Sequence, residues 1–232
     1  MGAISAADPA LKQSDWPPGP SPAILRGVLR LYRAPWSTNA ERVALALAHK
    51  DIEVESVVIS YDDRSPVEAV SGQGLVPVID NDGEVVSDSH AILRYIEQRW
   101  PDPPLFPAPS ARRAEMDLFM DWFDRVWKGP PNEIEAELAC SEPDESRIAR
   151  LSALMDARLD LFEQLLDGRD HLMGPELSAA DCVAFPFLKY ARERHRADTE
   201  TFHVVLDEHQ SVAGRPRLAA WIERMDARPR RY

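Results

Sequence analysis

The sequence predicts a small α/β domain followed by an all-helical domain. Signals for short β-strands are confined to residues 29–87. Residues 101–109 contain five prolines, which cannot continue a helix or a central strand, so a stiff linker is expected there. After the linker, apolar residues recur at the spacing of amphipathic helices. We therefore place the α/β domain at 26–100 and the helical domain at 110–232.

The composition is typical of a soluble globular protein and excludes several classes of partner. Of the 232 residues, 28% are charged, and the formal net charge of −12 disfavours nucleic acid or an anionic membrane as a partner. Residues 1–25 are rich in Pro, Ala and Ser and are expected to form a disordered leader. No secretory signal or membrane span is evident. Cys140 and Cys182 are expected to be small buried or semi-buried residues in a reducing, cytoplasmic compartment, and no metal-binding spacing is present.

The first predicted strand, residues 29–32, leads into a polar turn and a helix over 40–50. Thr38 and Glu41 have the spacing of a capping box at the start of this helix. The adjacent Ser37 places a hydroxyl group beside the first helical turn. A hydroxyl donor and the helix dipole together lower the pKa of a bound thiol, and the thiolate is the nucleophilic form.

A second strand is predicted over residues 53–59, and a β-hairpin follows it. Pro77 stands where the first strand of the hairpin begins, and an X–Pro bond at such a place can be cis. A cis bond would turn the backbone of Val76 outward, where it could pair with a peptide-like ligand. Asp88 and Ser89 then open a helix, whose N-terminus attracts a carboxylate.

The combination of these two motifs, residues 74–79 (GLVPVI) and 88–92 (DSHAI), resembles the thioredoxin-like domain of the glutathione S-transferase superfamily. The resemblance implies that Val76 pairs with the cysteinyl backbone of glutathione. It also implies that Asp88 and Ser89 hold the γ-glutamyl end. The helical second half is likewise similar to the C-terminal domain of that superfamily.

By the same resemblance, Ser37 is the catalytic residue that stabilises the glutathione thiolate, and Asn39 supports it. A second alignment puts Ala34 at the nucleophile position and would leave no catalytic group. Gln73 lies in the region that binds the glycyl carboxylate in some relatives. Many relatives have lysine where this chain has Leu75, which leaves recognition of the glycyl end open.

Four helices of the second domain are predicted from apolar periodicity and from cap residues. The first covers 111–128 and ends before a Gly-Pro-Pro sequence. The second covers 144–166. Ser178 and Asp181 form a capping box for a buried helix, so that Asp181 is expected to be structural. The last helix is predicted over 216–225.

Met120, Phe123 and Trp127 lie along one stripe of the helix at 111–128. At this spacing an apolar stripe is most simply explained as part of a hydrophobic core. In the relatives, residues of this helix also wall the pocket for the electrophile. The three residues are therefore weak candidates for the electrophile pocket.

The resulting hypothesis is a glutathione S-transferase with a role in detoxification that joins the glutathione thiolate to an apolar electrophile. Glutathione would be the co-substrate, no metal would be needed, and the family suggests a homodimer. One alternative is a glutathione-dependent isomerase or lyase on the same scaffold. The other is a non-catalytic binding module that uses the fold for assembly.

Overall fold

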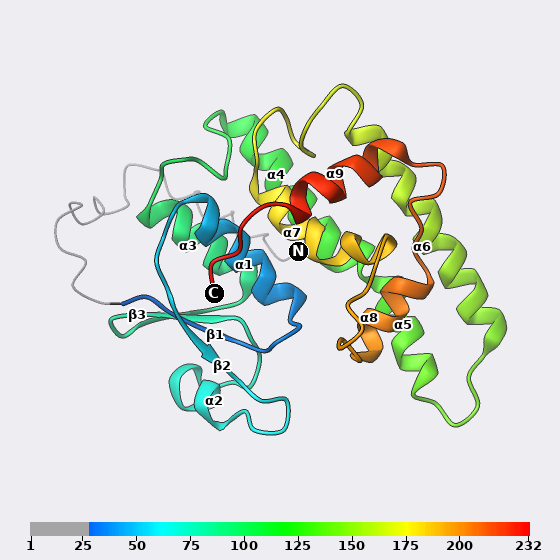
Figure 1. Cartoon of the computed structure of the whole chain (residues 1–232), viewed down its shortest axis with the longest axis horizontal. Coiled ribbons are helices and arrows are strands. Elements are labelled where there is room, and N and C mark those ends of the chain that lie inside the picture. The colour runs from blue at the N-terminus through cyan, green and yellow to red at the C-terminus, as the bar shows by residue number, and fades with distance from the viewer. Residues whose placement is uncertain (1–27) are drawn as a thin grey trace, which may run out of the picture.

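The structure, a computed structural model, describes residues 28–232 and shows a sheet-containing domain joined to a helical domain (Figure 1). The predicted fold class is confirmed. The leader predicted at 1–25 lies outside the described residues. The α/β domain consists of β1 (Arg30–Arg33), α1 (Thr38–His49), β2 (Glu55–Val58), α2 (Ser65–Ser71), β3 (Val78–Asn81), β4 (Glu84–Ser87) and α3 (Ser89–Arg99).

The four strands form one mixed sheet in the order β2-β1-β3-β4. β1 is parallel to β2, whereas β3 is antiparallel to both β1 and β4. Side chains alternate along a strand, so Leu31 packs in the core with α1 and α3 while Tyr32 packs in the smaller core with α2. The sheet is therefore covered on both faces, and α1 lies between it and the helical domain (Figure 1).

The predicted hairpin between β3 and β4 is confirmed. Its turn residues Asp82 and Gly83 both have positive φ angles, 53° and 90°, as the tightest right-twisting hairpins require. The Val76–Pro77 peptide bond is cis, as expected from the position of the proline. β3 begins at Val78, directly after this bond.

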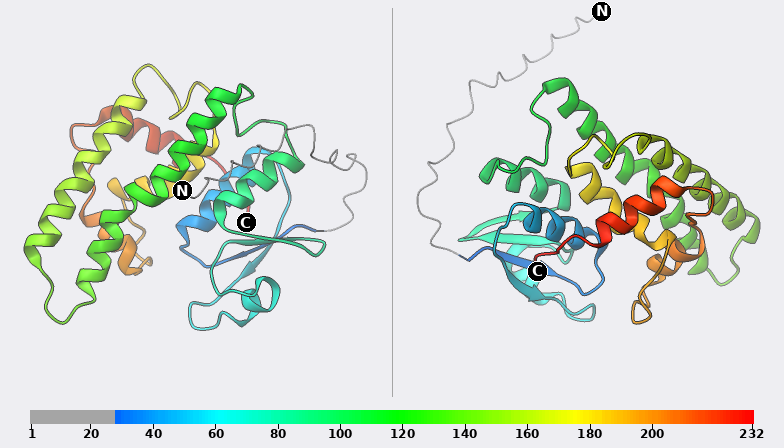
Figure 2. Two further views of the ribbon diagram at one scale, coloured as in Figure 1. Left: turned by 180° about the vertical axis from the view of Figure 1, so that it is seen from behind. Right: turned by 45° about the horizontal axis from the view of Figure 1, so that its top comes forward.

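The helical domain stands beside the sheet domain, and residues 100–109 connect the two (Figure 2). Its elements are α4 (Ser110–Trp122), the π-helical turn η2 (Phe123–Trp127), α5 (Gly129–Leu138), α6 (Glu145–Leu165), α7 (Ala179–Leu188), the 3₁₀ turn η3 (Lys189–Ala191), α8 (Thr201–Glu208) and α9 (Pro216–Asp226).

The structure corrects the prediction that the helix from residue 111 ends at Lys128 because of the prolines that follow. The regular helix instead widens into η2, where the N–H of Lys128 donates to the carbonyl of Phe123 at 3.0 Å. Pro130 and Pro131 then lie in the first turn of α5. Proline is favoured in a first turn because the N–H it lacks would have no helical partner. The prolines thus begin a helix that the prediction did not include.

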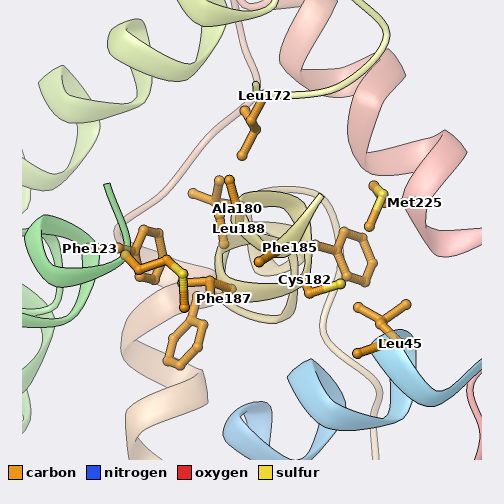
Figure 3. Close-up of a cluster of buried hydrophobic side chains, with 14 of the residues drawn as sticks. Leu45, Phe123, Leu172, Ala180, Cys182, Phe185, Phe187, Leu188 and Met225 are labelled. Atoms are coloured by element: carbon orange, nitrogen blue, oxygen red, sulfur yellow. The ribbon is translucent and has the colours of Figure 1, made fainter. Parts of the chain in front are cut away.

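Helix α7 is the centre of the helical core, and every one of its residues is buried. Figure 3 shows Leu45 of α1, Phe123 of η2 and Met225 of α9 arranged around it. The predicted capping box at its N-terminus is confirmed: Asp181 accepts hydrogen bonds from the N–H and the hydroxyl of Ser178 at 3.0 and 2.7 Å.

The chain after α9 returns to the α/β domain and lies beside α1 (Figures 1 and 2). The N–H of Arg231 donates to the carbonyl of Ala44 at 3.0 Å. Arg230 forms an ion pair of 3.1 Å with Glu41 of α1, and Glu41 also pairs with Lys189 of η3 at 2.5 Å. Helix α1 is therefore bound both to the C-terminal segment and to η3 of the helical domain.

Candidate active site

A cleft of about 270 Å³ lies between the two domains, at the N-terminus of α1. The β1–α1 turn, the loop before α2 and the segment before β3 form the wall on the α/β side, and the start of α8 forms the opposite wall. Its lining residues are Ala34, Ser37, Thr38, Tyr61, Arg64, Gly74, Leu75, Val76, Glu200, Phe202 and His203.

Ser37 is the N-cap of α1 and lines the cleft. Its Oγ accepts a hydrogen bond of 3.2 Å from the N–H of Ala40. The cap predicted at Thr38 is therefore one residue too late, and Glu41, its predicted partner, forms ion pairs instead. Because the cap uses the serine oxygen only as an acceptor, the hydroxyl hydrogen remains available for a ligand.

Val76 lines the same cleft, on the side of the sheet. Within the described chain, neither its N–H nor its C=O takes part in a hydrogen bond. Gln73 does not line the cleft; its side chain bonds the N–H and the C=O of Leu75, at 2.6 and 3.0 Å. Gln73 thus braces the loop that presents Val76, while the Leu75 side chain is 77% exposed.

Asp88 and Ser89 start α3 at the end of β4, next to the strand that follows Val76. Asp88 is exposed, and its side chain caps the helix by accepting from the N–H of Ala91 at 2.9 Å. Ser89 is buried, and its Oγ accepts a bond of 3.2 Å from Arg42. Neither residue is among those that line the cleft. The sheet register nevertheless places them beside the segment containing Val76.

Ser89 is held by a buried cluster of polar side chains between the domains. Arg42 is completely buried and makes a two-pronged contact with Asp124, at 2.7 and 3.2 Å. Asp124 lies in the π-helical turn η2, whose residues Phe123 and Trp127 are buried in the core. Burial and the nearby Arg42 lower the pKa of His90, which lies 3.3 Å from Asp124. Burial likewise lowers the pKa of Lys128.

The structure places the three candidates for the electrophile pocket away from the cleft. Met120, Phe123 and Trp127 are at most 1% exposed and lie in the core, not in the cleft. The apolar stripe is present as predicted. Periodicity alone, however, does not tell that the stripe faces α6 and α7. Phe202 and His203 of α8 line the cleft instead. The amino-acid pattern of α8 does not reveal them, because this helix has only eight residues.

Asn39 and the two cysteines lie outside the lining of the cleft. Asn39 is half-buried in the first turn of α1 and does not line the cleft. Cys182 is buried as expected, but Cys140 is exposed at the end of α5. Within residues 28–232, no three potential metal ligands gather into a site. No helix of this described part has the length and apolar character needed to cross a bilayer.

Two family models match the chain over most of the described residues. The model of the glutathione S-transferase N-terminal domain matches residues 31–104, and that of the C-terminal domain matches residues 145–224. The chain belongs to the glutathione S-transferase superfamily. The cleft thus lies where the two domains of a glutathione S-transferase fold meet.

Curated relatives in this superfamily are distant. Glutathione S-transferase L1 of Arabidopsis thaliana is 26% identical over 88% of this chain and 81% of its own length. FtsZ-localized protein A of Caulobacter vibrioides is 31% identical over 66% of this chain and 73% of its own length. A solved structure of a glutathione S-transferase from Rhodospirillum rubrum superposes with a TM-score of 0.67 and 28% identity, covering 87% of this chain and 89% of that one.

Proposed function

We propose that this member of the superfamily is a glutathione transferase that joins the glutathione sulfur to an electrophilic small molecule. One observation carries the proposal: the hydroxyl hydrogen of Ser37 and the backbone groups of Val76, which have no partner among residues 28–232, open into one interdomain cleft. The cleft therefore offers an anion site and a peptide-binding edge side by side.

The chemistry assigned to Ser37 is stabilisation of a thiolate. Its hydroxyl donates to the sulfur, while the N-terminus of the 12-residue helix α1 adds partial positive charge. Each unit by which the thiol pKa falls corresponds to about 1.4 kcal/mol. A larger thiolate fraction at neutral pH supplies more of the nucleophile that attacks the electrophile.

The peptide is held at three places in this proposal. The backbone of Val76 pairs with the cysteinyl residue in the manner of an added strand. Ser89 and Asp88, at the N-terminus of α3, hold the γ-glutamyl end; the contact from Arg42 leaves the hydrogen of Ser89 free for a carboxylate. Arg64 lines the cleft and supplies a cation for the glycyl carboxylate, which Leu75 cannot do.

Calorimetric titration with glutathione tests the proposal. We expect Arg64→Gln to weaken binding by about ten-fold, the scale of one charge-assisted hydrogen bond. Arg150→Gln is the matched control, because Arg150 is exposed on α6 and remote from the cleft. Unchanged affinity in Arg64→Gln would remove Arg64 from the site. A folded wild-type protein that does not bind glutathione would overturn the proposed function.

The second candidate is a non-catalytic binding module, and the similarity to FtsZ-localized protein A favours it. Probable maleylacetoacetate isomerase of Caenorhabditis elegans, 36% identical over 74 residues, keeps isomerisation as a variant of the enzymatic proposal. Three outcomes separate these functions. Turnover of a chloro-aromatic compound indicates a transferase, and turnover of a maleyl double bond indicates an isomerase. Turnover of neither substrate indicates a binding module.

A further inference from the structure

Three buried polar side chains form a connected group behind the α8 wall of the cleft. Asp198 is 1% exposed and lies 2.9 Å from the Nδ1 atom of His203. Asp198 also accepts a hydrogen bond of 2.8 Å from the hydroxyl of Tyr190. The His203 ring stacks on the Tyr190 ring, with centroids 4.8 Å apart. The ring of His203 is thus fixed in position and direction.

This arrangement determines which nitrogen of His203 is available. Asp198 accepts a hydrogen bond from the N–H at Nδ1, so in the neutral ring Nε2 carries a lone pair. His203 lines the cleft, and Nε2 forms no hydrogen bond to another described residue. An aspartate that orients a histidine in this way also stabilises the imidazolium that forms when Nε2 takes up a proton.

Other titratable groups face the same region from several elements. Glu200 lies one turn before His203, and Glu135 on α5 interacts electrostatically with the histidine. From the α/β domain, Tyr61 and Arg64 line the cleft. Burial and then the charge of Glu200 raise the pKa of Tyr61. The phenol of Tyr61 is therefore a proton donor at neutral pH and not a competing base.

The segment that carries Asp198 is docked against the Ser37 turn. His195 stacks on Trp36, the residue before Ser37, with ring centroids 5.1 Å apart. Arg194 bonds the carbonyl of Asp198 and forms an ion pair with Asp207 of α8 at 3.3 Å. The helical-domain wall that contains His203 is thereby held opposite the thiolate position.

We propose that His203 is a catalytic acid–base residue and that the electrophiles of this enzyme are activated alkenes, such as α,β-unsaturated carbonyl compounds. The inference rests on the proposed function, since Ser37 must hold the glutathione sulfur in the same cleft. Nothing in the sequence pattern indicated this residue, because its aspartate partner lies in an irregular segment.

The proposed reaction is balanced without another reactant. The thiol of glutathione loses its proton to solvent, and the sulfur, held as a thiolate by Ser37, forms a bond to the β-carbon of the alkene. The π electron pair of the alkene moves onto the carbonyl oxygen as an enolate. His203, protonated on Nε2 from solvent, then delivers a proton to the α-carbon. The net change is addition of S–H across the double bond.

An aromatic substitution makes a different demand on the site. A halide leaves with its electron pair and needs no proton, so a positioned acid contributes little to that reaction. Proton transfer by a positioned side chain contributes roughly a hundred-fold or more where a proton is needed. A site with Asp198 behind His203 therefore favours addition over substitution.

The test compares an enone, benzylideneacetone, with chlorodinitrobenzene in the full-length protein. In His203→Asn, the amide can still donate to Asp198, but no group replaces Nε2. We expect kcat/KM for the enone to fall about a hundred-fold and kcat/KM for the chloro-aromatic to change little. His209→Asn is the matched control, because His209 ends the same helix and bonds Ser152 outside the cleft.

Two more measurements separate catalysis from structural support. Added imidazole should restore enone addition in His203→Gly, which loss of packing alone would not allow. Asp198→Asn should also lower enone addition more than substitution. Equal loss with both electrophiles, or full enone activity in His203→Asn, overturns the inference while leaving the proposed function in place. A wild-type protein that binds glutathione but conjugates neither electrophile overturns both.

Discussion

Ser37 combines a structural and a chemical task in one hydroxyl group. Its oxygen accepts a hydrogen bond from the N–H of Ala40 and so caps the start of α1. Its hydrogen can donate to a ligand in the cleft. A simple alanine variant would confuse the two tasks, because loss of an N-cap alone costs about 1 kcal/mol. Glycine is a better replacement, since it is tolerated at N-cap positions with a loss of only a few tenths of a kcal/mol.

We therefore predict that Ser37→Gly lowers kcat/KM at least ten-fold with little change in stability, the scale of one lost donor to an anion. Ser37→Thr keeps both the hydroxyl and the cap and serves as the control. Absorbance of the bound thiolate, titrated against pH, should show a higher thiol pKa in the glycine variant. If the glycine variant keeps wild-type turnover, the donor lies elsewhere, with Asn39 or a backbone N–H as the next candidate.

At the scale of elements, His90 lies in the first turn of α3, in surroundings that disfavour its protonation. Burial and the neighbouring Arg42 lower the pKa of His90 below its ordinary value of 6.5. As the pH falls below about 6.5, the unfolded chain binds a proton that the folded protein does not. Stability is therefore complete above that pH and decreases as the pH falls, by at most about 1.4 kcal/mol per pH unit for one group.

We predict that urea denaturation at pH 7.5 and 5.5 shows this loss in the wild-type protein and a smaller loss in His90→Gln. His195→Gln serves as the comparison variant, since it replaces an exposed histidine in the same way. The same loss of stability in His90→Gln and in the wild-type protein would show that His90 does not contribute.

Elements with strong local signals could be predicted from the sequence, and those set by tertiary contacts could not. The cis bond before Pro77, the hairpin turn and the capping box of Asp181 each depend on a few neighbouring residues. Helix α8 depends instead on Asp198, whose side chain also accepts a bond of 3.3 Å from the N–H of Glu200. Only the folded chain brings this short helix and Ser37 to one cleft, which is why half of the candidate site was not foreseen.

At the scale of the whole molecule, one hydrophobic core runs through both domains, and α1 lies at their junction. The two domains share one packed core, so they do not open about a hinge and the cleft between them is rigid. The homodimer expected from the family stays a prediction; Leu118, 72% exposed on α4, is the kind of side chain that a second copy would cover.

We predict that the ion pair between Arg230 and Glu41 contributes to the stability of the whole molecule. A double-mutant cycle with Arg230→Met and Glu41→Gln should give a coupling of about 1 kcal/mol in chemical denaturation, because these side chains are 15% and 8% exposed. The exposed pair Arg94–Asp117 is the control and should give a smaller coupling. Equal coupling in the two cycles would show that burial adds nothing to the Arg230 pair.

The strap formed by residues 228–232 has a practical consequence for the laboratory. Arg33 stacks on the ring of Tyr232 at 4.3 Å, and Arg231 donates a hydrogen bond to the backbone of α1, so a peptide appended there begins beside the helix that Ser37 caps. We expect an affinity tag or a fluorescent protein fused after Tyr232 to change turnover without entering the cleft. Kinetic work on this protein is therefore best done with such additions at the other end of the chain.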